Sequence, residues 1–209
     1  MIIYLHGFRS SKRSLKARQL SDYLSIHAPA ESLWCEDLNC SPTLAIQQIE
    51  DAIHRCSQKP LLVGSSLGGY YATYLAELHD LKAVLINPAC EAADLLAPCV
   101  GPQRNIYTGE VFELTQEHID DLRRIHVHKL TLPERFWVLL ETDDEVLDYR
   151  QAIKFYRGAR FSVIEGGNHG FESFPEFLPE ILSLSTAEAG QGPTSHNECD
   201  AGDIPIDGA

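Results

Sequence analysis

Short blocks of aliphatic and aromatic residues recur along the chain and alternate with longer segments of helical period. Most of these blocks are continuous, which is typical of strands that are covered on both faces. They lie at residues 2–5, 32–38, 60–64, 82–87, 135–142 and 160–166, and helical spacing occurs at residues 12–27, 43–56, 67–79, 149–157 and 175–184. This alternation predicts an α/β fold in which helices cover both faces of a mostly parallel sheet of about six strands.

Residues with helix-capping side chains support several of these boundaries. Ser10 or Ser11 is expected to cap the first helix, Ser41 and Pro42 open the second, and Asp148 precedes the segment YRQAIKFY. Serine and aspartate accept hydrogen bonds from the free N–H groups of a first turn, and proline is favoured at the first helical position. We therefore expect helices to begin at these residues.

Residues 88–134 interrupt the alternation. This segment is rich in loop-forming residues and contains one clear helical pattern, at residues 115–127, which Thr115 is expected to cap. An insertion at this point would overhang the ends of the strands and act as a small lid. An ordinary long crossover explains the same sequence equally well, so both interpretations stay open.

Length and composition predict one globular domain over residues 1–185. A chain of 209 residues with 44% hydrophobic content can bury about 70% of its unfolded surface. Residues 186–209 have no helical or strand period and are rich in glycine, proline and acids, which predicts an acidic flexible tail. The metal-ligating residue types of the tail match no known ligand loop, so we expect neither a metal nor another cofactor.

The net charge of −13 argues against a nucleic-acid partner, because the chain would repel a phosphate backbone. Every lysine and arginine lies at or before Arg160, so the excess of acid belongs to the carboxyl end. No segment approaches the roughly 20 apolar residues of a membrane span. The amino-terminal segment MIIYLHGF lacks the features of a signal peptide, and we expect a cytoplasmic protein with no membrane partner.

The cysteines form no CxxC pair, which gives no basis for a zinc or redox motif. Thiols stay reduced in the cytosol, although Cys35 and Cys40 would be able to pair in an oxidising compartment. We expect free and mostly buried thiols at Cys35, Cys40, Cys56, Cys90, Cys99 and Cys199.

The segment PLLVGSSLGGYYATYLAEL, at residues 60–78, contains the candidate nucleophile. Gly64, Ser66 and Gly68 form a GxSxG pattern between a predicted buried strand and a predicted helix. A change from strand to helix within one residue strains the backbone and brings neighbouring side chains into collision, which the glycines relieve. The Ser66 hydroxyl would project at a helix amino terminus, where free N–H groups favour negative charge. A glycine-rich turn that binds phosphate is the alternative, but neither GxGxxG nor GxxxxGK[ST] is present.

A reactive serine needs a histidine to take its proton and an acid to orient that histidine. In α/β-hydrolases the chain order is serine, acid, histidine. His169 fits this order, because it stands in GGNHGF directly after the last predicted strand, where glycines let the loop fold over the strand ends. Asp143 and Asp144 follow the predicted strand at 135–142, and both are candidates for the acid.

An oxyanion hole requires two N–H donors that are already in place. One donor is expected from Leu67, the residue after the candidate nucleophile. The other is expected from Phe8, which follows His6 and Gly7 in the loop after the first predicted strand. The pair of candidate donors therefore comes from two segments that are about 60 residues apart in the sequence.

Together, the segments MIIYLHGF, VGSSLGG, LINPA, DDEVLDYRQA and GGNHGF resemble the α/β-hydrolase superfamily and, within it, the small bacterial YqiA/YcfP-type esterase family. The resemblance covers residues 1 to about 184 and implies a compact α/β-hydrolase fold that begins directly with the HGF strand. The acid loop of that family reads GDEVLDY, which implies that Asp144 is the acid. This chain has Asp143 in place of the glycine, so Asp143 remains a second candidate.

These residues predict acyl transfer through Ser66, His169 and Asp144, with Phe8 and Leu67 at the oxyanion. The resemblance implies hydrolysis of short acyl esters or thioesters, and hence a small-molecule ester or thioester partner. An insertion of this length builds at most a small lid, so we expect an open, shallow site that Tyr70, Tyr107 and Phe112 would line. The alternatives are a hydrolase-fold binding protein without turnover, and a serine peptidase or acyltransferase with the same triad.

Overall fold

One parallel sheet of six strands forms the centre of the molecule, in the order β2-β1-β3-β4-β7-β8. The computed structural model describes residues 1–186, so the predicted acidic tail and Cys199 lie outside the described residues. The strands are β1 (Ile2–Leu5), β2 (Leu33–Trp34), β3 (Leu61–Ser65), β4 (Ala83–Ile86), β7 (Phe136–Glu141) and β8 (Arg160–Ile164). The predicted α/β architecture with a parallel sheet of about six strands is confirmed.

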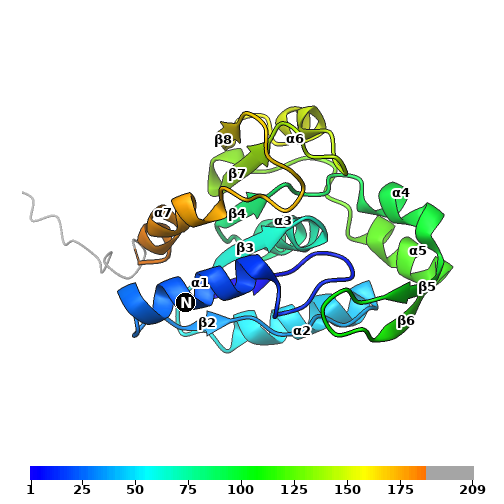
Figure 1. Ribbon diagram of the computed structural model, residues 1–209, viewed down its shortest axis with the longest axis horizontal. Coiled ribbons are helices and arrows are strands. Elements are labelled where there is room, and N and C mark those ends of the chain that lie inside the picture. Colours follow the sequence, from blue (N-terminus) through cyan, green and yellow to red (C-terminus); the bar gives the residue numbers. More distant parts are fainter. Residues whose placement is uncertain (187–209) are drawn as a thin grey trace, which may run out of the picture.

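Helices cover both faces of this sheet, as the continuous apolar strands predict (Figure 1). The α-helices are α1 (Leu15–His27), α2 (Pro42–His54), α3 (Leu67–His79), α4 (Ala92–Leu96), α5 (Gln116–Arg124), α6 (Tyr149–Phe155) and α7 (Phe174–Thr186). Two short 3₁₀ turns occur at η1 (Ala97–Cys99) and η2 (Pro133–Arg135). Helices α1 and α7 lie side by side on one face, and α2, α3, α5 and α6 pack on the other.

Alternation along each strand divides the core into two layers, because successive side chains of a strand point to opposite faces. In β1, Ile2 and Tyr4 pack in the cluster with α1 and α7, whereas Ile3 and Leu5 pack in the cluster with α2 and α3. All four side chains are fully buried. Burial on both sides is the reason that the strand sequences are continuous and apolar rather than alternating.

Several boundaries differ from those expected. Ser14 caps α1, because its hydroxyl accepts a hydrogen bond from the N–H of Ala17, and the expected cap Ser11 instead accepts from the N–H of Arg13. The strand expected at 32–38 shortens to the two residues of β2. The expected caps Ser41, Thr115 and Asp148 are confirmed.

The segment 88–134 contains a small antiparallel hairpin that the sequence analysis missed. Its strands are β5 (Gly101–Arg104) and β6 (Val111–Leu114). Figure 1 shows this hairpin beside the dark blue loop that follows β1. Three hydrogen bonds join the two segments, from Arg9 Nε to Arg104 O (3.0 Å), from Ile106 N to Arg9 O (2.9 Å) and from Asn105 Nδ2 to Ser10 O (2.7 Å).

Two further expectations concern the burial of the cysteines and the presence of membrane-spanning helices. The five described cysteines are free, but only Cys90 is buried, so the expectation of mostly buried thiols is wrong. Cys40 is exposed, because it lies in the loop that leads to α2 rather than in a core element. No helix within residues 1–186 is both long enough and apolar enough to cross a bilayer.

Candidate active site

Ser66 occupies the single residue between β3, which ends at Ser65, and α3, which begins at Leu67. Its backbone is strained, with φ 55° and ψ −118°, a region that non-glycine residues rarely adopt. A β-carbon added at Gly64 would collide with the backbone of Gly68, and one added at Gly68 would collide with the carbonyl of Leu5. Both glycines of the GxSxG pattern are therefore required by close approach of the backbone.

His169 lies in the loop between β8 and α7 and reaches the Ser66 hydroxyl. The distance from His169 Nε2 to Ser66 Oγ is 3.0 Å, and the distance from His169 Nδ1 to Asp144 Oδ2 is 2.8 Å. The side chain of His169 is 23% exposed, whereas that of Asp144 is only 2% exposed. With Asp144 ionised, Nδ1 donates its proton to the carboxylate and Nε2 is left to accept the hydrogen of the Ser66 hydroxyl.

Hydrogen bonds keep Asp144 ionised beside the imidazole. Burial opposes the charge, but hydrogen bonds from the His169 ring and from the N–H groups of Leu147 and Val146 outweigh it and lower the pKa of Asp144. Asp143 is exposed, and its carboxylate accepts a hydrogen bond only from Thr142 Oγ1 (3.4 Å) among the described side chains. The structure therefore brings Asp144, and not Asp143, to His169.

The two expected oxyanion donors come from two segments that meet at Ser66. Leu67 is the first residue of α3, and the loop that carries Phe8 passes so close that a β-carbon at Gly7 would lie 3.2 Å from Ser66 Cβ. Within residues 1–186, neither the N–H of Phe8 nor that of Leu67 donates a hydrogen bond. Two free N–H groups near a serine hydroxyl are able to stabilise an oxyanion.

His6 fixes the loop that carries Phe8, a role that the sequence analysis did not assign. Its Nδ1 donates to the carbonyl of Gly7 (2.9 Å), and its Nε2 accepts from the N–H of Leu38 (3.0 Å). Burial lowers the pKa of His6, so the neutral ring that this pattern needs is favoured. The imidazole therefore joins the loop after β1 to the segment before α2.

The loop that carries His169 is held by buried groups that the sequence analysis also missed. Glu141, at the end of β7, is fully buried and accepts hydrogen bonds from the N–H of Asn168 (2.8 Å) and from the N–H (3.0 Å) and hydroxyl (2.7 Å) of Ser173. Asn87, at the end of β4, donates to the carbonyl of Asn168 (3.1 Å). The sequence feature that indicates this role is the acid at the end of the apolar block WVLLE, because an acid buried there needs hydrogen-bond donors as partners.

Two further contacts hold the same loop. The ammonium group of Lys16 donates to the carbonyl of Gly170 (2.6 Å), and Glu145 accepts from the N–H of His169 (2.9 Å). Burial lowers the pKa of Lys16 to about 8, although the charges of Glu141 and Asp144 oppose this shift. The backbone around His169 is thus bonded to four side chains, those of Lys16, Asn87, Glu141 and Glu145.

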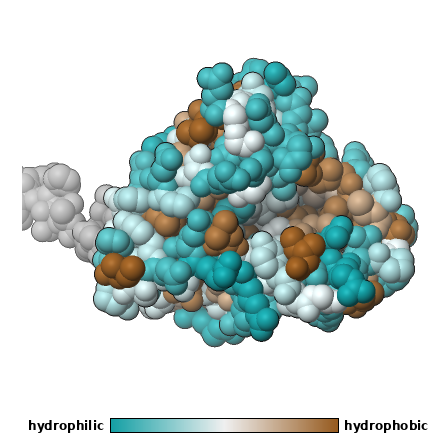
Figure 2. Space-filling model, viewed as in Figure 1, coloured by the Kyte–Doolittle hydropathy of each residue, from teal (hydrophilic) through white to brown (hydrophobic). Residues whose placement is uncertain are grey.

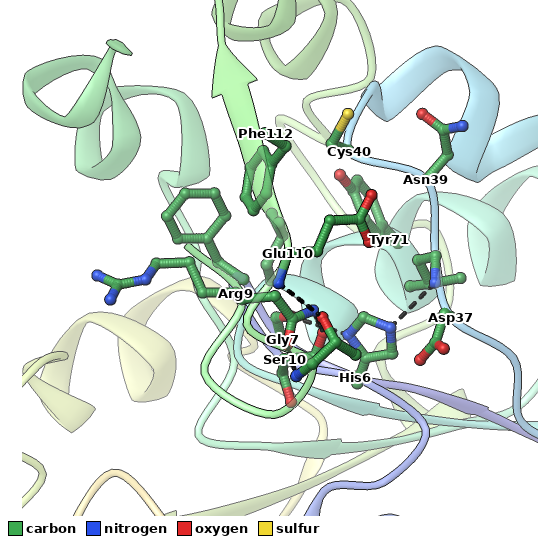
Figure 3. A pocket seen from close by; sticks show the side chains of 15 residues that line it. His6, Gly7, Arg9, Ser10, Asp37, Asn39, Cys40, Tyr71, Glu110 and Phe112 are labelled. Atoms are coloured by element: carbon green, nitrogen blue, oxygen red, sulfur yellow. Dashed lines mark hydrogen bonds between the residues drawn. The ribbon is translucent and has the colours of Figure 1, made fainter. Parts of the chain in front are cut away.

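Two cavities are lined by residues next to the candidate triad in the sequence, although neither is lined by Ser66, His169 or Asp144. One, of about 300 Å³, lies under the β5–β6 hairpin beside Phe8 and Leu67 (Figure 3). The other, of about 320 Å³, lies between α4 and the residues that follow Asp144. In Figure 2 the surface is hollowed between the part that carries β8 and α6 and the part that carries the hairpin, and apolar surface gathers over α4.

The three aromatic residues expected at the pocket have different positions. Phe112 lines the cavity under the hairpin, and its ring packs edge-on against Phe8 with centroids 5.9 Å apart. Tyr70 is buried, and its hydroxyl donates to the carbonyl of Leu122 (2.8 Å). Tyr107 is 40% exposed near the tip of the hairpin. Within residues 1–186 no cluster of His, Cys, Asp and Glu is arranged to hold a metal ion.

Comparison with known proteins assigns the family. A model of an uncharacterised protein family, UPF0227, matches residues 1–186. The chain belongs to the UPF0227 family. A UPF0227 protein of Pectobacterium carotovorum is 25% identical over 201 residues, which cover 89% of this chain and 99% of the relative. The expected membership of the YqiA/YcfP-type family is confirmed.

Solved structures similar to this UPF0227 chain share its fold. A putative hydrolase from Agrobacterium vitis has a TM-score of 0.71 at 19% identity, covering 88% of this chain and 87% of its own. Mouse alpha/beta hydrolase domain-containing protein 10 has a TM-score of 0.68 at 16% identity, covering 88% of both chains. A monoacylglycerol lipase from Paleococcus ferrophilus has a TM-score of 0.63 at 16% identity, covering 88% of this chain and 94% of its own. The predicted α/β-hydrolase fold is confirmed, and it resembles that of esterases and lipases.

Proposed function

We propose that this UPF0227 protein is a serine hydrolase that cleaves short acyl esters or thioesters through an acyl-enzyme. The observation that carries the proposal is the continuous chain of hydrogen bonds from Ser66 Oγ through His169 to Asp144, with distances of 3.0 and 2.8 Å. Such a chain converts a weak nucleophile into a reactive one, because the proton of the hydroxyl has an acceptor already in position. The resemblance of the fold to hydrolases agrees with the proposal.

In the proposed mechanism, Ser66 Oγ forms a bond to the carbonyl carbon while its proton passes to His169 Nε2. The N–H groups of Phe8 and Leu67 hold the carbonyl oxygen as it gains negative charge. His169 returns the proton to the leaving alcohol or thiol as its bond to the carbonyl carbon breaks. Water, deprotonated by the same imidazole, then attacks the acyl-enzyme, and the acid is released as the bond from Ser66 Oγ to the acyl carbon breaks and His169 returns the proton to Oγ. Asp144 keeps the ring in one tautomer throughout.

The nucleophile is tested with Ser66→Ala protein and p-nitrophenyl butyrate. We expect turnover to fall by a factor on the order of 10⁶, the scale seen when a triad serine is removed. A fluorophosphonate probe should label the parent protein covalently at Ser66 and leave the variant unlabelled. An unlabelled parent protein, or parental turnover by the variant, would contradict the assignment of Ser66 as the nucleophile.

The acyl group is expected to be short, because the segment 88–134 contributes only α4, η1, a four-residue-per-strand hairpin and α5 beside the site. A series of p-nitrophenyl esters from acetate to palmitate measures this expectation. Activity should be highest for short chains, and a steep preference for long chains would contradict it. Adding an amine or alcohol acceptor to the same assay separates hydrolysis from acyl transfer, and a peptide substrate separates esterase from peptidase activity.

A further inference from the structure

The cavity under the hairpin is lined by both candidate oxyanion donors. Phe8 and Leu67 form part of its wall, together with residues of the hairpin and of the segment 37–40 before α2. A substrate whose carbonyl oxygen is held by these two N–H groups would therefore place one of its substituents at this cavity. The inference that follows rests on the proposed serine hydrolase function.

The walls of this cavity are fixed relative to each other. The hairpin is bonded to the loop after β1 through Arg104, Ile106 and Asn105, and Phe112 packs edge-on against Phe8. The opposite wall is joined to the same loop by the contact from His6 to the N–H of Leu38. The cavity is therefore already formed in the absence of ligand, as small-molecule sites usually are.

Tyr71 places a polar group without a partner in this cavity. Its side chain is only 3% exposed, and it lines the cavity from α3. Within residues 1–186 its hydroxyl forms no hydrogen bond, and burial raises its pKa, so the group is a neutral donor and acceptor. Because this hydroxyl is not one of the fully enclosed polar atoms without a partner, it opens onto the cavity and is free to bond to a ligand there.

Glu110 supplies a second group, this time a charged acceptor. Figure 3 shows its side chain directed into the cavity, while the guanidinium of Arg9 points away, where it donates to Arg104 O. Within the described residues the Glu110 carboxylate is in no salt bridge. A carboxylate in this position disfavours an anionic ligand by repulsion between like charges.

Tyr71 and Glu110 together define what the cavity is able to bind. The Tyr71 hydroxyl donates or accepts a hydrogen bond and the Glu110 carboxylate accepts one, which matches a group that both donates and accepts hydrogen bonds. A hydroxyl does both, and the faces of Phe112 and Tyr71 provide apolar surface for the carbon skeleton that bears it.

We propose that this cavity binds the hydroxyl-bearing alcohol part of the substrate, so that the protein cleaves partial esters of an uncharged polyol or sugar. In a partial ester only some hydroxyls of the polyol are acylated, so the remaining ones are free on the alcohol part. Tyr71 and Glu110 are the specificity-determining residues in this proposal. Glu110 accepts a hydrogen bond from one hydroxyl, and Tyr71 bonds to another.

The test compares two esters that differ only in two hydroxyls, glycerol 1-monobutyrate and n-propyl butyrate. The parent protein should cleave the glycerol ester with a kcat/KM at least about 10-fold higher. Tyr71→Phe and Glu110→Gln should each lower kcat/KM for the glycerol ester about 3- to 10-fold, the value of one hydrogen bond. In both variants the kcat/KM for n-propyl butyrate should stay within about twofold of the parent value. Equal kcat/KM for the two esters, or parallel losses on both, would overturn the proposal.

Two matched variants control for indirect effects. Tyr74→Phe makes the same change on α3 outside the cavity, and Glu113→Gln lies on β6 at a position of opposite parity to Phe112, which faces the cavity. Neither should alter the ratio of kcat/KM between the two esters. If either one lowers the ratio as much as the cavity variants do, the cavity is not the source of the preference.

A binding measurement separates this proposal from the proposed function. Saturation-transfer NMR on Ser66→Ala protein should show transfer to the glycerol protons of the monobutyrate, and Tyr71→Phe in the same background should raise the Kd from a titration about 3- to 10-fold. Absence of transfer to the glycerol protons would overturn the cavity assignment. Failure of the parent protein to cleave any ester, with the transfer intact, would overturn the hydrolase function alone.

Discussion

The carboxylate of Glu141 accepts a hydrogen bond from the backbone N–H of Asn168, the residue immediately before His169. Glu141 is fully buried at the end of β7, and the loop that it holds contains the candidate base. Asp144, three residues later, contacts the imidazole itself. One short segment thus supplies both the group that orients the ring and the group that positions its backbone.

Glu141→Gln should therefore reduce activity without any contact to substrate. The amide keeps one acceptor for Ser173 but turns an NH₂ group toward the N–H of Asn168, which leaves two buried donors facing each other. We expect a loss of about 1–3 kcal/mol in the free energy of unfolding and a fall in kcat of about 10- to 100-fold from displacement of His169. Urea unfolding and ester hydrolysis measure the two effects.

Glu145→Gln is the control for this change. Glu145 also bonds to the loop, at the N–H of His169, but it is exposed, and its amide is free to rotate and keep an acceptor in place. Glu145→Gln should lower the free energy of unfolding by less than about 1 kcal/mol, because substitutions at exposed positions usually have small effects. Equal losses of stability and of kcat in Glu141→Gln and Glu145→Gln would contradict the claim that burial of Glu141 is the cause of its effect.

Gly167 and Gly166 form a matched pair for testing the same contact. Both have positive φ, at 77° and 83°, so alanine is strained at either position. A β-carbon at Gly167 would collide with the Glu141 carboxylate, whereas nothing lies within 4 Å of one at Gly166. Gly166→Ala should lower the free energy of unfolding by about 1 kcal/mol. Gly167→Ala should lower it further and should also lower kcat. Thermal unfolding and kcat are the measurements, and equal effects on both would contradict a close fit against Glu141.

The pKa of Glu141 gives a stability effect with a definite sign. Burial would raise this pKa, but the hydrogen bonds from Asn168 and Ser173 outweigh burial and lower it below the ordinary value of 4.5. The unfolded chain therefore takes up the proton at a higher pH than the folded one, so the stabilisation is complete above pH 4.5 and is lost as the pH falls below it. The difference in unfolding free energy between the parent protein and Glu141→Gln should shrink from pH 6 to pH 3. A difference that is independent of pH would exclude this linkage.

The order of elements could be predicted from the sequence because strands that are buried on both faces leave continuous apolar blocks. Leu61–Ser65 and Leu67–His79 follow directly from that pattern and from the glycines around Ser66. The hairpin could not be predicted, because its strand Gly101–Arg104 begins with glycine and proline and has no fully buried residue. What holds it is contact with Arg9 and Ser10, which are about 95 residues earlier in the chain.

The candidate site shows the same division. Ser66 and His169 stand in local patterns that chemistry explains, so they could be named from the sequence. The supporting residues Asn87, Glu141 and His6 act through contacts across strand ends, and such contacts depend on the order of strands in the sheet. Asp143 and Asp144 are adjacent and identical in type, so only the direction of each side chain distinguishes them.

That distinction leads to the sharpest test of the acid. Asp144→Asn should lower kcat about 10⁴-fold, because the amide no longer stabilises the tautomer with the proton on Nδ1. Asp143→Asn makes the same chemical change one residue earlier, at an exposed carboxylate that bonds only to Thr142 among the described side chains, and should leave kcat within about threefold. Both variants are assayed with p-nitrophenyl butyrate, and labelling with a fluorophosphonate probe reports on Ser66 directly. A larger loss from Asp143→Asn than from Asp144→Asn would assign the acid to the other residue and would require the loop after β7 to change conformation when substrate binds.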